Sequence, residues 1–97
     1  MNEEEEAKEL ILYLYIAGMT PTASRALANI RSICVEYLDA RHSLEVIDLV
    51  ERPDLAESHQ IFAIPTLVRE RPLPVRKIIG DLSDTQKVVA GLEIKAA

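Results

Sequence analysis

The stretch LILYLYIAGMTPT, from Leu10 to Thr22, decides the fold. Its first seven residues are all apolar or aromatic, which is typical of a strand covered on both faces. Gly18 favours a turn after this strand. Thr20 is a good helix N-cap, and Pro21 suits the first position of a helix. The stretch therefore predicts a central strand that leads through a tight turn into a helix.

An amphipathic helix is expected after this turn. From Ala23 to Leu38 the apolar residues recur at spacings of three and four, with polar residues between them, which predicts one buried stripe. We expect the helix to end between residues 39 and 42. The apolar run Leu44 to Val50 predicts a second strand. Because strand, crossover helix and strand form a βαβ unit, the two strands are expected to be parallel.

The chain after this unit predicts a short helix and two more strands. Residues 53–59 predict a helix that opens on a proline. Residues 66–69 and 75–79 are interpreted as strands, joined by the proline-rich connection 71–74. The apolar runs between residues 61 and 80 are short and do not alternate with polar residues. Periodicity therefore does not separate strand from helix in that region.

A last helix is expected near the end of the chain. Ser83 followed three residues later by Gln86 forms a capping box, which marks the start of a helix toward Gly91. The complete order is then βαβαββα, which is the thioredoxin-like arrangement. We therefore expect an α/β protein with a thioredoxin-like fold and a βαβ first half.

Length and composition predict one domain. A chain of 97 residues has no room for a second core, and we expect residues 9–97 to form the domain. Residues 1–8 include the run Glu3 to Glu6 and are expected to be an acidic, disordered tail. An acidic start is the reverse of a signal peptide, and no apolar run approaches the length of a membrane span. We therefore expect a cytoplasmic protein.

The cysteines that a thioredoxin-like frame usually carries at its first turn are missing. With Pro21 aligned to the proline of Cys-x-x-Cys motifs, Met19 and Thr22 occupy the cysteine positions. The single cysteine, Cys34, is expected on the apolar face of the first helix, where a thiol fills the core. A two-cysteine redox mechanism is thereby excluded. A reductase or transferase that uses Cys34 or the Thr20 hydroxyl is the enzymatic alternative.

No metal, cofactor or nucleic-acid site is expected. His42 and His59 each lack a second ligand at the spacing that zinc requires, and the net charge of −5 does not favour nucleic acid. Four basic residues gather around the predicted hairpin: Arg69, Arg71, Arg76 and Lys77. They form either a charged edge that discourages strand pairing or a basic patch for an acidic protein surface.

Three runs of sequence together resemble one protein family. Residues 14–21 resemble its first strand and turn, residues 63–67 its Pro-Thr element, and residues 73–83 its most characteristic run. The family is KaiB, the small clock protein of the cyanobacterial oscillator. The resemblance covers about residues 10 to 94 without gaps.

The resemblance implies a non-enzymatic regulatory protein. KaiB proteins bind the hexameric ATPase KaiC, and in clock systems they sequester KaiA and compete with a sensor kinase that has a KaiB-like domain. The free form is a homotetramer or dimer whose second half is packed differently, while the KaiC-binding form is a monomer with the thioredoxin order. The alternative function is a redox-inactive, thioredoxin-like oligomeric scaffold or adaptor in stress signalling, without a KaiC partner.

The resemblance also assigns candidate residues. Arg25 matches a family position near the partner surface, Gly91 matches a glycine of the switch region, Glu45 stands where many clock KaiB proteins have a lysine, and Glu93 replaces an aspartate. The partner-binding candidates are Arg25, Glu45, Arg76 and Lys77. The candidate pivots of the fold switch are Pro65, Pro72, Pro74, Gly80, Gly91 and Glu93.

Overall fold

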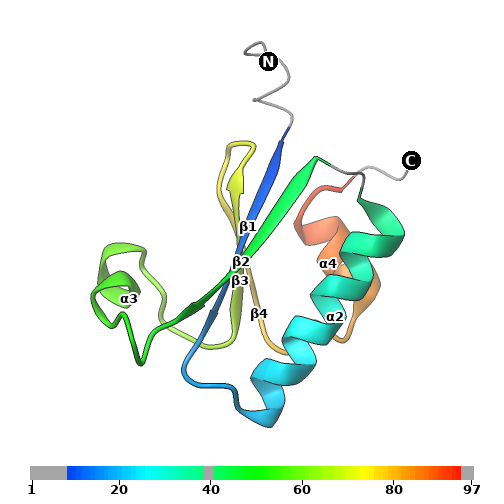
Figure 1. Ribbon diagram of the computed structural model, residues 1–97. Helices are drawn as coiled ribbons and strands as arrows, with labels where there is room; N and C mark the ends of the chain where they lie inside the picture. Colours follow the sequence, from blue (N-terminus) through cyan, green and yellow to red (C-terminus); the bar gives the residue numbers. More distant parts are fainter. Residues whose placement is uncertain (1–8, 39–40, 95–97) are drawn as a thin grey trace.

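The described part of the chain forms a four-stranded sheet with three helices (Figure 1). The computed structural model describes residues 9–38 and 41–94. In chain order the elements are β1 (Leu10–Ile16), α2 (Pro21–Tyr37), β2 (His42–Asp48), α3 (Asp54–Ser58), β3 (Thr66–Arg71), β4 (Arg76–Ile79) and α4 (Thr85–Gly91). The order βαβαββα is the one that the sequence predicts. The acidic tail expected at residues 1–8 lies outside the described residues.

β1 is a central strand, as its uniform apolar character predicts. The sheet order is β2-β1-β3-β4. β1 pairs in parallel with β2, from Leu10 opposite His42 to Ile16 opposite Asp48, and in antiparallel fashion with β3. β3 pairs in antiparallel fashion with β4. β2 and β4 are therefore the two edges of the sheet.

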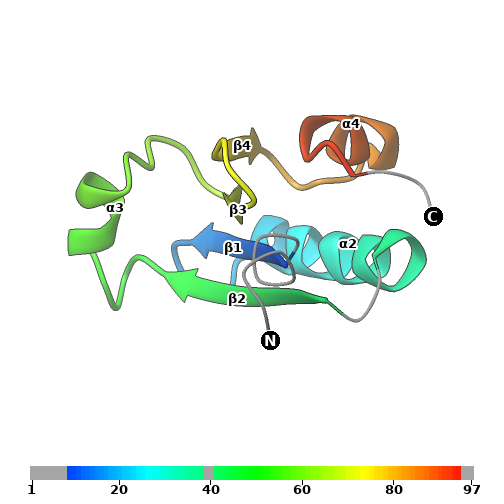
Figure 2. The same cartoon turned by 90° about the horizontal axis from the view of Figure 1, so that it is seen from above.

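The main hydrophobic core lies on the face of the sheet that α2 and α4 cover (Figure 2). Its buried members are Leu12, Leu14, Ile16, Ala23, Ala26, Ile30, Ile33, Cys34, Leu67, Ile78, Leu82, Val88 and Leu92. A smaller cluster lies on the other face, toward α3, and contains Tyr15, Ile47, Ile61 and Val68. We call this less covered side the outer face of the sheet.

The predicted start of the long helix is confirmed. Thr20 is the N-cap of α2, and its Oγ1 accepts a hydrogen bond of 3.1 Å from the backbone N–H of Ala23. Pro21 occupies the first helical position. The helix ends at Tyr37, slightly before the predicted end, with Leu38 as its C-cap. The turn and the cap thus fix where α2 begins after β1.

Several predicted boundaries are wrong by one or two residues, and for two of them the structure shows the reason. β2 ends at Asp48 rather than Val50, because the Asp48 carboxylate accepts the backbone N–H of Val50 and turns the chain. α4 has Asp84 rather than Ser83 as its N-cap. The Asp84 carboxylate accepts from the backbone N–H of Lys87 at 3.1 Å, and a carboxylate is a stronger acceptor at a helix N-terminus than a hydroxyl.

The contact of Gly91 with Ile78 leads to a first prediction. A methyl group on Gly91 would lie 2.9 Å from Ile78 Cδ1. Alanine in a helix is more stable than glycine by about 0.5–1 kcal/mol, and this contact opposes that gain. In an Ile78→Val background the Cδ1 atom is absent. We expect the change in the free energy of unfolding caused by Gly91→Ala to be about 1 kcal/mol more favourable there than in the wild-type background. Urea unfolding of the four proteins measures this coupling, and effects that simply add would contradict it.

Candidate functional site

The end of the sheet that carries the catalytic turn in thioredoxins is well ordered by hydrogen bonds. The backbone N–H of Gly18 donates to Asp48 Oδ1 at 3.0 Å, and the N–H of Gly80 donates to the carbonyl of Pro65 at 3.0 Å. Gly18 has φ of +75°, a conformation that glycine adopts at little cost. The frame of a thioredoxin-type site is thus retained.

None of the three residues considered for catalysis, Met19, Thr20 and Cys34, offers a reactive group at this end of the sheet. Met19 is 57% exposed in the position of the first cysteine. The Thr20 hydroxyl accepts the helix-capping bond. Cys34 is buried, and burial raises the pKa of its thiol, which disfavours the reactive thiolate. Within residues 9–38 and 41–94, no group of three or more His, Cys, Asp and Glu residues is arranged to hold a metal ion.

Exposed apolar side chains surround this end of the sheet instead. Phe62 is 91% exposed, Ile79 63% and Ile64 48%. Ile64 precedes Pro65, whose carbonyl holds Gly80 just beyond Ile79, so these side chains lie on neighbouring segments. We call Met19, Phe62, Ile64 and Ile79 the apolar rim. Large exposed apolar groups that gather in one region mark a surface for protein contacts.

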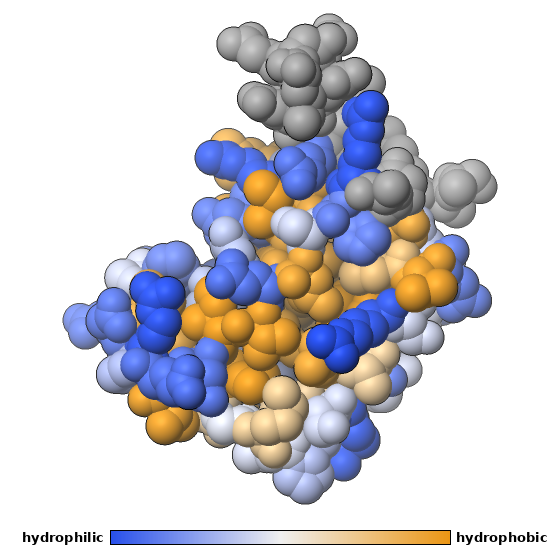
Figure 3. Space-filling model, viewed as in Figure 1, coloured by the Kyte–Doolittle hydropathy of each residue, from blue (hydrophilic) through white to orange (hydrophobic). Residues whose placement is uncertain are grey.

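Apolar side chains also gather along the β2 edge, between α3 and α2 (Figure 3). Leu44, Val46 and Leu49 are only partly buried there. Because β2 is an edge of the sheet, its backbone is not covered by another strand on that side. This edge is a second apolar region of the surface, separate from the apolar rim.

Arg25 lies on the first turns of α2, near the apolar rim. Its side chain is 59% exposed, and Nε lies 3.8 Å from Asp81 Oδ2. Hydrogen bonds from Ser83, followed by the charge of Arg25, lower the pKa of the Asp81 carboxyl. Asp81 directly follows Gly80, which is bonded to Pro65. Arg25 therefore adds a positive charge beside the exposed apolar side chains.

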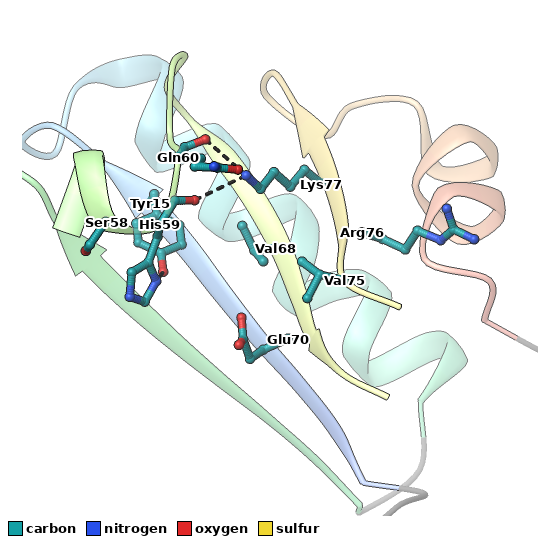
Figure 4. Close-up of a pocket in the computed structure, with 9 residues that line it drawn as sticks. All are labelled: Tyr15, Ser58, His59, Gln60, Val68, Glu70, Val75, Arg76 and Lys77. Atoms are coloured by element: carbon teal, nitrogen blue, oxygen red, sulfur yellow. Dashed lines mark hydrogen bonds between the residues drawn. The ribbon is translucent and has the colours of Figure 1, made fainter. Parts of the chain in front are cut away.

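The other partner-binding candidates do not form one patch with Arg25. Glu45 lies on β2 and Arg76 and Lys77 lie on β4, so they occupy opposite edges of the sheet. Arg76 Nη2 donates to Glu93 Oε1 at 2.7 Å. Lys77 Nζ donates to the carbonyls of His59 and Gln60, at 3.1 and 3.0 Å (Figure 4). Arg76 thus links β4 to the segment after α4, and Lys77 links β4 to the segment after α3.

Arg69 was expected in an exposed basic cluster, and that expectation is wrong. Its side chain is only 4% exposed. Nη1 donates to the carbonyl of Leu92 and Nη2 to that of Pro74, both at 2.7 Å, and Glu93 Oε2 lies 3.8 Å from Nη1. Leu67, two residues earlier and therefore on the same face of the strand, belongs to the main core, so Arg69 points toward the side that α4 covers. Arg69 therefore joins the end of α4 to the β3–β4 connection.

The candidate pivots have unusual backbone geometry. Pro65, Pro72 and Pro74 each follow a cis peptide bond, Gly80 has φ of +121° and Glu93 has φ of +56°. Gly91 packs closely on Ile78. All of them lie in the second half of the chain, and their role in a change of packing stays a prediction.

Cys34 provides a prediction about pH. Burial raises its pKa in the folded state, so the unfolded chain releases this proton at lower pH than the native protein does. The stability that the neutral thiol contributes is present below the unfolded pKa, about 8.5, and is lost as pH rises above it. Between pH 7.5 and 10 we expect the free energy of unfolding to fall more steeply in the wild type than in Cys34→Ala. Equal slopes in urea unfolding would contradict this.

Comparison with known proteins identifies the family. The sequence model described as the KaiB domain matches residues 13–94. The chain belongs to the KaiB family. It is 48% identical over 87 residues to the circadian clock oscillator protein KaiB of Microcystis aeruginosa, with 90% of this chain and 84% of that protein covered. It is 42% identical over 89 residues to the circadian clock protein KaiB3 of Synechocystis, with 92% and 87% covered.

Solved structures show the same fold outside close KaiB relatives. The N-terminal domain of Synechococcus elongatus SasA superimposes with a TM-score of 0.73 at 24% identity, over 90% of this chain and 86% of that domain. A thioredoxin of Fasciola hepatica gives a TM-score of 0.71 at 15% identity, over 95% and 86%. The thioredoxin-like fold expected from the sequence is therefore confirmed. Among the described helices, none has the length and apolar character needed to cross a bilayer.

Proposed function

We propose that this KaiB-family protein is a non-enzymatic regulator that binds a KaiC-like hexameric ATPase and modulates its ATPase and phosphorylation cycle. The observation that carries the proposal is the apolar rim at the end of the sheet where a thioredoxin has its redox site. Phe62 and Ile79, at 91% and 63% exposed, expose apolar surface that a partner would remove from water. Arg25 beside the rim supplies a charge that orients the partner.

Other clock components belong to the same proposal. In systems that have a KaiA-like protein, the complex with the ATPase sequesters it. The presence of this fold in the SasA N-terminal domain supports competition between KaiB-like domains of sensor kinases and this protein for one ATPase surface. Glu45, which carries a negative charge where many relatives have a positive one, is expected to favour an ATPase with a basic residue at the contact.

We propose that the free protein is a dimer or tetramer with a rearranged second half. The support is the membership of the KaiB family, together with the short apolar runs of residues 61–80, whose periodicity does not separate strand from helix. If the binding-competent packing is a minor state of the free protein, the apparent affinity falls by its population. Complex formation is then slow.

Size-exclusion chromatography with light scattering tests the proposal directly. The protein is mixed with the KaiC-like ATPase encoded nearby, with ATP and Mg²⁺, and sampled over a day. We expect a slow shift of both proteins to a larger complex. Free oligomers without any complex after a day would count against ATPase binding and favour the alternative, an oligomeric scaffold in stress signalling.

A further inference from the structure

The end of the sheet where β1 and β2 begin (Figure 1) carries a cavity of about 220 Å³. Leu10, Leu38, Arg41, Arg69, Pro72 and Ile94 are among the residues that line it. This end is the opposite one from the apolar rim, since β1 runs from Leu10 here to Ile16 beside the turn at Gly18. The cavity is therefore separate from the surface proposed to bind the ATPase.

The chain enters β1 beside this cavity, between two arginines. The backbone N–H of Leu10 donates to the carbonyl of Arg41 at 3.1 Å, and on the other side Ile11 is the register partner of Arg71. The acidic run Glu3–Glu6 stands four to seven residues before Leu10. Four extended residues span up to about 14 Å, so the attachment at Leu10 holds the run within reach of the cavity.

The strand ends around the cavity carry an excess of positive charge. In the described part of the chain, the charged residues of these strand ends and of the segment after α4 are Arg41, Arg69, Arg71, Arg76, Glu9 and Glu93. Even if Glu70 is added, which lines a pocket on the outer face of the sheet, the arginines outnumber the glutamates. Arg71 is exposed, and among the described residues its side chain has no ion-pair or hydrogen-bond partner.

Arg69 adds a buried charge that is only partly compensated. Its side chain is 4% exposed, and Glu93 Oε2 lies 3.8 Å from its Nη1. The same carboxylate accepts from Arg76 Nη2 at 2.7 Å, so two arginines share one negative charge. Among the described residues, Arg69 Nε has no hydrogen-bond partner. Because a buried charge is costly unless it is well paired, a further carboxylate beside this wall of the cavity would stabilise it.

We propose that the acidic run Glu3–Glu6 of the same chain binds this basic end of the sheet, with one glutamate carboxylate in the cavity near Arg69 and the others beside Arg71. The contact screens the basic end from other acidic groups. It also favours the observed packing of the second half, because Arg69 joins Leu92 to Pro74 in that packing.

Covalent attachment favours this segment over other anions. A tethered group acts at an effective concentration in the millimolar range, so weak attraction is enough to hold it. A cavity of about 220 Å³ has room for one side chain rather than for the whole run. Four consecutive glutamates can each occupy it, so binding in several registers does not require a folded segment. The contact needs no partner protein and is independent of the proposed ATPase binding.

NMR of the full chain tests the contact at low salt. We follow molecules with NOEs between β3 and β4, which mark this packing. We expect NOEs from the glutamate Hγ protons of residues 3–6 to the methyl groups of Leu38 and Ile94. They should disappear in about 0.5 M NaCl, where the Debye length is about 4 Å. Replacement of all four glutamates by glutamine should also remove the corresponding NOEs.

Arg71→Gln and a matched control locate the contact. We expect Arg71→Gln to weaken the NOEs about twofold or more, since exposed ion pairs are modest. Arg52→Gln removes an exposed arginine beyond the far end of β2 and should leave them unchanged. NOEs that survive the glutamine replacement, or that Arg71→Gln leaves at full strength, would overturn the proposal. Their absence from the wild type, or a protein without β3–β4 NOEs, would do the same.

A mixture of isotope-labelled and unlabelled chains identifies the source of the segment. Contacts within one chain give no NOEs between labelled and unlabelled molecules, which is the expected result. NOEs that cross from one to the other would show that the run of a second copy occupies the cavity, and would overturn binding within the chain.

Discussion

Replacement of Arg69 by methionine is expected to lower the free energy of unfolding by about 3 kcal/mol. The guanidinium donates to the carbonyls of Leu92 and Pro74, both at 2.7 Å, and the side chain is 4% exposed. Methionine fills a similar volume but cannot donate, so it leaves the buried carbonyl of Leu92 without this partner. Hydrogen bonds from charged donors are worth about 1.5–3 kcal/mol each, and the desolvation of the guanidinium offsets part of their sum.

A neighbouring arginine supplies the matched control. Arg71 lies two residues further along β3 and is exposed, so Arg71→Met makes the same chemical change without the buried contacts. We expect its effect on the free energy of unfolding to be within about 0.5 kcal/mol. Urea unfolding measures both variants. In Arg69→Met, hydrogen exchange should also become faster at the amides of Val88 and Leu92. Equal stability of the two variants would show that the desolvation cost of Arg69 cancels its hydrogen bonds.

Truncation of two side chains of the apolar rim is expected to weaken the complex with a KaiC-like ATPase about 100-fold. In the double variant Phe62→Ala/Ile64→Ala, two large side chains that are 91% and 48% exposed in the free protein no longer reach the partner. Central apolar residues of an interface contribute about 1–2 kcal/mol each or more when truncated, and about 3 kcal/mol corresponds to this factor. Because both side chains are largely exposed, the stability of the free protein should change little.

The control for this prediction uses exposed apolar residues elsewhere. Val35, on α2, is 86% exposed, and Leu73, in the β3–β4 connection, is 64% exposed. We expect Val35→Ala/Leu73→Ala to bind the ATPase within threefold of the wild type. Dissociation constants from biolayer interferometry at equilibrium give the comparison. If the control loses as much affinity as the rim variant, the partner contacts another surface.

The first half of the fold could be predicted from the sequence because local signals agree there. The apolar run Leu10 to Ile16, the Thr20 cap and the apolar stripe of the long helix all point to β1 and α2. In the second half, residues of the same type in the same strand differ in burial. Arg69 and Arg71 are both basic strand residues, yet the first is buried by α4 and the second is exposed. Only the tertiary contacts distinguish them.

The sequence led to a hypothesis about the kind of site, a protein-binding surface, but not about where on the fold its residues lie. The absence of cysteines at positions 19 and 22 excluded a two-cysteine redox mechanism, and the KaiB resemblance pointed to a binding protein. The sequence did not reveal that Glu45 and Lys77 lie on opposite edges of the sheet, since that depends on the strand order. Nor did it indicate the apolar rim, because Phe62 and Ile64 read equally well as core residues.

The Asp48 carboxylate, which accepts from both Gly18 and Val50, has a consequence for synthesis on the ribosome. All partners of this carboxylate, and the whole pairing of β1 with β2, lie within the first fifty residues. We therefore expect the nascent chain to close its βαβ unit while β3 is still inside the exit tunnel. The backbone hydrogen-bonding groups on one side of β1 then stay unpaired until β3, Thr66–Arg71, emerges from the tunnel. During that interval the growing chain is most exposed to aggregation and most in need of a chaperone.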